Sequence, residues 1–146
     1  MMRTSVFSRV AIAFAGLFGA LGTAGAALAA HGGGDRQMLT IAAAIAFVHA
    51  PALLALGLVG PGRLRARALP GSAWIVGVLL FSGDLGSRAF LDGRLFVNAA
   101  PTGGSILIVG WASLVVLAFL PTRDSAVRHG RDEPMRERDE KGRGRR

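Results

Sequence analysis

Residues 10–30 read VAIAFAGLFGALGTAGAALAA and residues 38–59 read MLTIAAAIAFVHAPALLALGLV, two stretches without a charged side chain. A helix that crosses the roughly 30 Å hydrocarbon layer of a bilayer needs about 20 apolar residues, and both stretches reach that length. A helix suits such a segment because it satisfies its own backbone hydrogen bonds in lipid. Both stretches are too long and continuous for the strands of a membrane barrel. They predict spanning helices over about residues 8–30 and 38–59.

Two further apolar stretches follow. The stretch from 69 to 91 is cleanly apolar only as far as Phe81, and it reaches spanning length by continuing through Asp84 and Arg88. The stretch from 101 to 120 carries no charge. Together the four stretches predict an all-α fold, an integral membrane four-helix bundle within residues 1–120. A chain of 146 residues leaves no room for a separate catalytic domain.

The basic residues alternate with the apolar stretches in a way that predicts the orientation of the chain. Arginines precede the first stretch, separate the second from the third, and recur after the fourth, where residues 121–146 mix charges of both signs. Cytoplasmic segments of membrane proteins carry the excess of Lys and Arg. We therefore expect a multi-pass protein of the bacterial inner membrane with both termini cytoplasmic and a disordered, charged tail over 121–146. The net charge of +8 is explained in this way without nucleic acid as a partner. The residues that carry the excess outside the tail are Arg3, Arg9, Arg63, Arg65 and Arg67.

The first apolar stretch has a second interpretation as a cleaved signal peptide. Arg3 and Arg9 resemble a basic leader, and Ala27-Leu28-Ala29 resembles a cleavage site. The apolar stretch is longer than the usual signal-peptide core of about 7–15 residues, which favours a retained helix. Small residues also recur every four positions from Ala15 to Ala27, a spacing that allows helices to approach closely in lipid.

Composition and motifs argue against an enzyme. The chain has no cysteine and no tyrosine, which removes thiolate chemistry, Cys-ligated metals and a phenolic acid. No nucleophile–base–acid pattern, paired catalytic carboxylates or nucleotide-binding glycine motif is recognisable. His31, His49 and His129 fall at different depths of the predicted topology, so they are not expected to share a metal. We predict no cofactor and no metal site.

Three ionisable residues within the predicted spans form the candidate intramembrane polar site: His49, Asp84 and Arg88. Such residues are costly in lipid and often mark proton or ion pathways. Asp84 and Arg88 are four residues apart on one helical face, the acid first, so they can neutralise each other. His49 lies near the middle of its span, and Pro51 is placed to free a backbone carbonyl for it. A proton relay is the functional interpretation, and helix-to-helix structure is the favoured alternative.

A second group of residues predicts close helix packing rather than chemistry. Pro101 suits the first turn of the fourth helix, and glycines allow backbones to approach. Trp74 is expected in the aromatic belt at the cytoplasmic interface, whereas Trp111 is expected to pack against another helix. The predicted packing motif consists of Ser82, Gly83, Pro101, Gly103, Gly104, Gly110 and Trp111.

These motifs carry a family resemblance. The run Leu80-Phe81-Ser82-Gly83-Asp84-Leu85, followed by Pro101-Thr102-Gly103-Gly104 and then Gly110-Trp111, resembles the domain of unknown function 423 family. These are small bacterial inner-membrane proteins, similar to eukaryotic transmembrane protein 256. His49-Ala50 fits the family's histidine in the second helix, although Val48 stands where the family has an aromatic residue. The resemblance implies four helices and the inner membrane, and it implies no activity.

The sequence thus predicts a non-enzymatic membrane or accessory protein, in contact with the lipid bilayer and with a second copy or another membrane protein as candidate partner. The alternative is a small proton- or solute-translocating protein that acts as an oligomer. Small multidrug transporters have this size and helix number but rely on an acid in the first helix, where this chain has none.

Overall fold

The computed structural model describes residues 5–32, 35–59 and 66–119, which form four α-helices and no strand. Each helix is long and apolar enough to cross a membrane. The predicted all-α membrane bundle is therefore confirmed. The predicted tail over 121–146 lies outside the described residues. The helices are α1 (Val6–His31), α2 (Arg36–Leu58), α3 (Ala68–Leu91) and α4 (Ala99–Ala118).

The helix boundaries follow local chemistry. The Ser5 hydroxyl accepts a hydrogen bond from the Ser8 amide at the start of α1, and the Asp35 carboxylate accepts one from the Met38 amide at the start of α2. The turn between α3 and α4 begins and ends with residues in the left-handed conformation, Asp92 and Asn98. Because α4 begins at Ala99 rather than at Pro101, the proline is its third residue, still within the first turn, where a missing N–H costs nothing.

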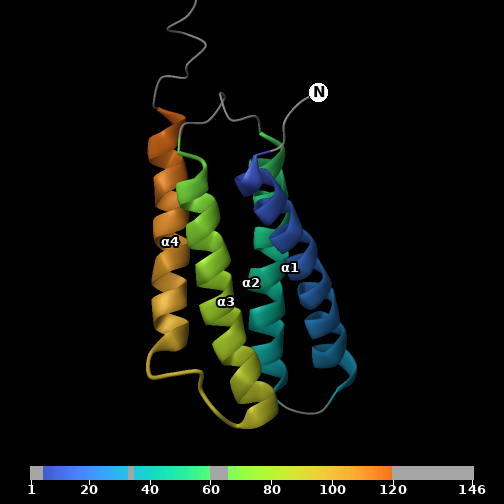
Figure 1. Cartoon of the computed structure of the whole chain (residues 1–146). Helices are drawn as coiled ribbons and strands as arrows, with labels where there is room; N and C mark the ends of the chain where they lie inside the picture. The colour runs from blue at the N-terminus through green and yellow to red at the C-terminus, as the bar shows by residue number, and fades with distance from the viewer. Residues whose placement is uncertain (1–4, 33–34, 60–65, 120–146) are drawn as a thin grey trace, which may run out of the picture.

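The helices lie side by side in chain order (Figure 1). α1 packs along α2, α2 packs on α3, and α3 packs on α4, while α1 and α4 do not meet within the described residues. α1 begins at the end of the bundle where α4 finishes (Figure 1). The outer helices therefore present broad apolar faces to lipid, including these α4 side chains: Ile108, Val109, Val115 and Val116.

The face of α1 that packs on α2 differs from the one expected from small residues at every fourth position. A Cβ added to Gly19 would lie 3.8 Å from the Ala50 Cβ, but Thr23 and Ala27 are exposed. Steps of four residues drift around a helix of 3.6 residues per turn, whereas alternating steps of three and four keep to one side. The buried positions follow that second spacing: Ser8, Ala11, Ala15, Phe18 and Gly22.

Glycine sets how closely α1 and α2 approach. A Cβ added to Gly22 would lie 3.0 Å from Phe47 Cβ and 3.1 Å from the Ala43 carbonyl oxygen. A Cβ on Gly25 would lie 3.1 Å from Ala43 Cβ. Small residues permit this approach in lipid, where packing and hydrogen bonds rather than water exclusion hold helices together.

Candidate intramembrane polar site

Asp84 anchors the α3–α4 turn as well as forming an ion pair. Its side chain is fully buried, and its Oδ2 accepts a hydrogen bond from Arg88 Nη2 at 2.5 Å. Its Oδ1 accepts one from the backbone amide of Leu95, at 2.9 Å. Since Leu95 lies in the turn that leads to α4, the carboxylate fixes the path between the two helices.

Arg88 lies close to the end of α3. Its side chain is 25% exposed, so the guanidinium is within reach of the interface while it pairs with Asp84. Its Nε is buried without a hydrogen-bond partner. This arrangement fits the structural interpretation of the pair, in which the arginine extends toward water and the acid turns inward.

His49 belongs to a different cluster, which it forms with two tryptophans. Its Nε2 accepts a hydrogen bond from Trp111 Nε1 at 3.1 Å, and its Nδ1 lies 2.7 Å from the Ile45 carbonyl oxygen. Because a carbonyl only accepts, Nδ1 carries the proton and Nε2 offers its lone pair. The carbonyl in contact is that of Ile45, not the Phe47 carbonyl that Pro51 frees, so the proline does not serve this histidine in the expected way.

Trp74 completes the cluster from α3. Its ring centroid lies 4.4 Å from that of Trp111 and 6.0 Å from that of His49. It is 1% exposed, so its expected place in a lipid-facing aromatic belt is wrong. A Cβ on Gly110 would lie 2.6 Å from Trp74 Cδ1, and this glycine therefore makes the room in which the indole is buried. The Trp74 Nε1 has no hydrogen-bond partner.

The structure does not bring the three ionisable residues together. Trp74, which contacts His49, and Asp84 are ten residues apart on α3, or about 15 Å along its axis. His49 joins α2 to α4 in mid-span, and Asp84 closes the turn at the far end of α3. A single relay site built from His49, Asp84 and Arg88 has no support in this separation.

The predicted packing residues lie mostly at helix contacts. A Cβ on Gly103 would lie 2.6 Å from the Phe81 amide nitrogen, and one on Gly77 would lie 2.5 Å from Leu107 Cδ2, so α3 and α4 meet through these two glycines. The Ser82 hydroxyl donates to the Ala42 carbonyl at 2.9 Å and links α3 to α2. The remaining members are placed as follows: Gly83 beside Leu95, Gly104 against the Phe81 ring, Gly110 under Trp74, Trp111 on His49, and Pro101 exposed.

Arg67 is a residue whose role the sequence does not reveal. It is 5% exposed and precedes α3, where Ala66 adopts the left-handed conformation with φ of 55°. Its Nη1 donates to the Leu56 carbonyl at 3.2 Å, and its Nη2 donates to the hydroxyls of Ser5 at 2.9 Å and Ser8 at 3.2 Å. Arg67 thus ties α1, α2 and α3 together at one end, although in the sequence it counts only as a basic loop residue.

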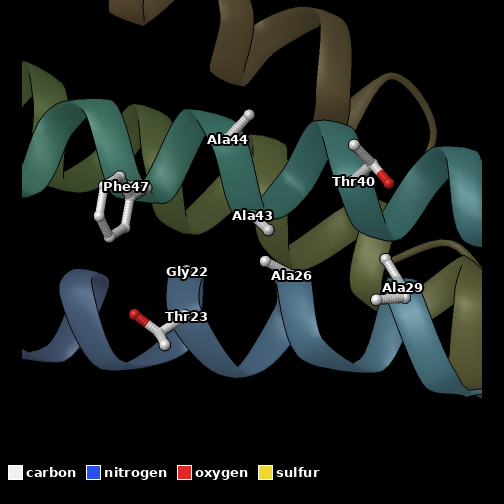
Figure 2. Close-up of a pocket in the computed structure, with 9 residues that line it drawn as sticks. Gly22, Thr23, Ala26, Ala29, Thr40, Ala43, Ala44 and Phe47 are labelled. Carbon is white, nitrogen blue, oxygen red and sulfur yellow. The ribbon is translucent and has the colours of Figure 1, made fainter.

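Apolar hollows occur between the helices of the described part of the chain. A groove of about 600 Å³ lies between α1 and α2 and is lined by residues of both helices, among them Thr23 and Phe47. Figure 2 shows Ala26 of α1 opposite Ala43 of α2 in this groove. The hydroxyls of Thr23 and Thr40 donate to carbonyls of their own helices, so neither donor is free for a ligand. A smaller crevice of about 220 Å³ is bounded by α1, α2 and α3 and is also apolar.

Within residues 5–32, 35–59 and 66–119, no three His, Asp or Glu residues lie close enough together to bind a metal ion.

The family is decided by the match of the sequence to known proteins. A model of the family described as "Protein of unknown function (DUF423)" matches residues 11–104. The chain belongs to this family. The matched part of this DUF423 protein runs from α1 into the first turns of α4 and includes Gly103 and Gly104. Gly110 and Trp111 lie beyond it, although they belong to the resemblance seen in the sequence.

This DUF423 protein is also similar to a UPF0382 membrane protein of Haemophilus influenzae. The two are 37% identical over 71 residues, which are 49% of this chain and 57% of the relative. The match therefore spans just over half of the relative's length. No solved structure matches the chain. A membrane protein relative and four apolar helices agree that this DUF423 protein is a multi-pass membrane protein in contact with lipid.

Proposed function

We propose that the chain is a non-enzymatic accessory protein of the bacterial inner membrane. The observation that carries the proposal is the engagement of the polar groups within the spans. Both oxygens of Asp84 and both ring nitrogens of His49 contact partners in the protein. A relay needs a group that exchanges its proton with a substrate or water, whereas these groups hold neighbouring helices in place. The broad apolar faces of α1 and α4 suit contact with lipid or with another membrane protein.

The competing function, translocation of a proton or small solute, predicts a different outcome in proteoliposomes. We expect the purified chain to give no pH-driven flux of protons or small solutes above that of protein-free vesicles. Asp84→Asn and His49→Ala should leave this flux unchanged. Purification in mild detergent is expected to retain a stable complex with a membrane partner. A flux that both substitutions abolish would establish transport instead, and a chain that is always recovered alone would remove the accessory role.

The orientation proposed for the chain has the N-terminus and the C-terminus in the cytoplasm. Support comes from the placement of basic residues, because Arg9 and Arg67 lie at the end of the bundle where α1 begins and α4 ends.

We also propose that α1 is retained and not removed as a signal peptide, because it forms part of the core of the bundle. Phe18 is 1% exposed, and Ser5 and Ser8 hold Arg67, so cleavage after Ala29 would remove all of these contacts.

Cysteine labelling tests the orientation directly, because the natural chain has no cysteine and each introduced thiol is unique. An impermeant maleimide added to spheroplasts is expected to label Arg94→Cys, in the α3–α4 turn. Thr4→Cys and Ser125→Cys should react only after the membrane is opened. Labelling of Ser125→Cys from outside would reverse the orientation. If protein purified after labelling of opened membranes carries no label at Thr4→Cys, α1 has been cleaved.

A further inference from the structure

The α3–α4 turn, residues 92–98, runs back along α3 instead of continuing outward from its end. The Leu95 amide donates to the Asp84 carboxylate at 2.9 Å. Asp84 lies seven residues before Leu91, the last residue of α3, or about 10 Å along the helix axis. Figure 1 shows α3 reaching further than the start of α4, with the turn covering the difference in height. About two helical turns that α4 lacks are thus replaced by a segment without helical structure.

The length of α4 places this turn relative to the bilayer. α4 has 20 residues and is therefore about 30 Å long, which is about the thickness of the hydrocarbon layer. A helix that only just crosses the hydrocarbon begins at its boundary, so the turn before Ala99 lies in the adjoining interfacial layer. The backbone of the turn and the exposed Asn98 side chain at its end suit this position. Polar groups outside helices need water or protein partners, and the hydrocarbon supplies no water.

The side chains of the turn change from polar to apolar in the direction of α4. Asp92 and Arg94 come first, and both are exposed. An apolar patch of Leu95, Phe96 and Val97 follows, and these side chains are 51%, 48% and 78% exposed. The charged part of the turn therefore lies beside the end of α3, further from the hydrocarbon, and the apolar patch lies beside the boundary where α4 begins.

Lipid is the occupant that suits this apolar patch. The patch has three side chains, whereas a stable protein–protein interface takes about 20–30 residues from each side. An anionic lipid has no advantage over a neutral one here, because acids and bases alternate at this end of the bundle. They are Asp35 and Arg36, Asp84 and Arg88, and Asp92 and Arg94. The contact therefore depends on apolar burial, as it does for amphipathic segments that lie in the membrane interface.

We propose that the α3–α4 turn is an interfacial membrane anchor, in which the apolar patch inserts into the lipid leaflet at this end of the bundle while Arg94 stays in water. Leu95 is fixed from two sides, because its amide is held by Asp84 and a Cβ on Gly83 would lie 3.3 Å from its Cδ1. The anchor thereby sets the depth at which α4 begins. It concerns lipid contact alone, so it depends neither on the accessory function nor on which leaflet this end faces.

Single cysteines in the reconstituted full-length protein test the anchor, because the natural chain has no cysteine. Bimane attached to Val97→Cys should be quenched more by lipid brominated near the headgroup end of its acyl chains than by lipid brominated near the methyl end. Val109→Cys, in the middle of α4 and exposed, should show the reverse order. Arg94→Cys is the matched control within the turn and should be quenched less than Val97→Cys by both lipids. An impermeant maleimide should react about tenfold more slowly with Val97→Cys than with Arg94→Cys.

Four results would overturn the anchor. If Val97→Cys reacts as fast as Arg94→Cys and is not quenched, the turn is exposed to water. If it neither reacts nor is quenched, a second copy or another protein covers the apolar patch. Stronger quenching from the methyl end would place the patch inside the hydrocarbon. Quenching only in vesicles that contain phosphatidylglycerol would show electrostatic attraction instead of apolar burial. Should Val97→Cys fail to reconstitute, Phe96→Cys decides by the same comparisons.

Discussion

Replacing Gly103 with alanine is expected to lower the free energy of unfolding by about 2 kcal/mol. The added Cβ would lie 2.6 Å from the Phe81 amide nitrogen and 2.8 Å from the Gly77 carbonyl oxygen. Both are backbone atoms, so no side chain can rotate to relieve the overlap, and α3 and α4 must move apart. Overpacking of this kind costs about 1–3 kcal/mol, and the higher helix propensity of alanine offsets part of that. Reversible unfolding in mixed micelles, followed by circular dichroism, gives the value.

Gly86→Ala is the matched control on α3, because a Cβ there would meet nothing within 4 Å. It receives the same gain in helix propensity without the overlap, so it should be neutral or stabilise the protein by up to about 1 kcal/mol. If Gly103→Ala proves as stable as Gly86→Ala, α3 and α4 are not held at the spacing described. Gly77 and Gly103 would then not set how closely these helices approach.

The elements of the fold could be predicted because they depend on local sequence. Uninterrupted apolar stretches of spanning length leave helices as the stable structure in lipid, and four of them appear at the expected places. The pairing of Asp84 with Arg88 was equally accessible, since residues four apart share a face of a helix. The second contact of Asp84, with the Leu95 amide, depends on the turn conformation, which residue spacing does not encode.

The contacts between helices could not be predicted, because they join residues far apart in the chain. His49 and Trp111 are separated by 62 positions, as Arg67 and Ser5 are. Which helix faces meet depends on small rotations about each axis, and a repeat of small residues at every fourth position proved a poor guide to them on α1. For the same reason Trp74, which by its position suits an interfacial belt, is turned inward onto Gly110.

Asp84→Ala is expected to destabilise the protein by about 3 kcal/mol, the larger of the two effects. Loss of the carboxylate leaves Arg88 without its counter-ion and the Leu95 amide without its acceptor. Breaking a buried pair from one side costs about 3–5 kcal/mol. The lower end applies because Arg88 is partly exposed and can turn toward water. The same micelle unfolding measurement applies, with Asp84→Asn as a milder variant that keeps an oxygen for Leu95.

A double-mutant cycle separates this structural role from a relay. Because Arg88→Ala removes the charge that Asp84→Ala strands, the double variant should be more stable than the sum of the single losses predicts, by about 1–2 kcal/mol. A residue kept for proton transfer has no reason to show such coupling, since its substitution impairs activity more than folding. Single variants that unfold like the natural chain would therefore contradict the structural assignment and return Asp84 to the list of candidate proton carriers. The ordering of the α3–α4 turn would then need another anchor, because the Leu95 amide is held there by the Asp84 carboxylate.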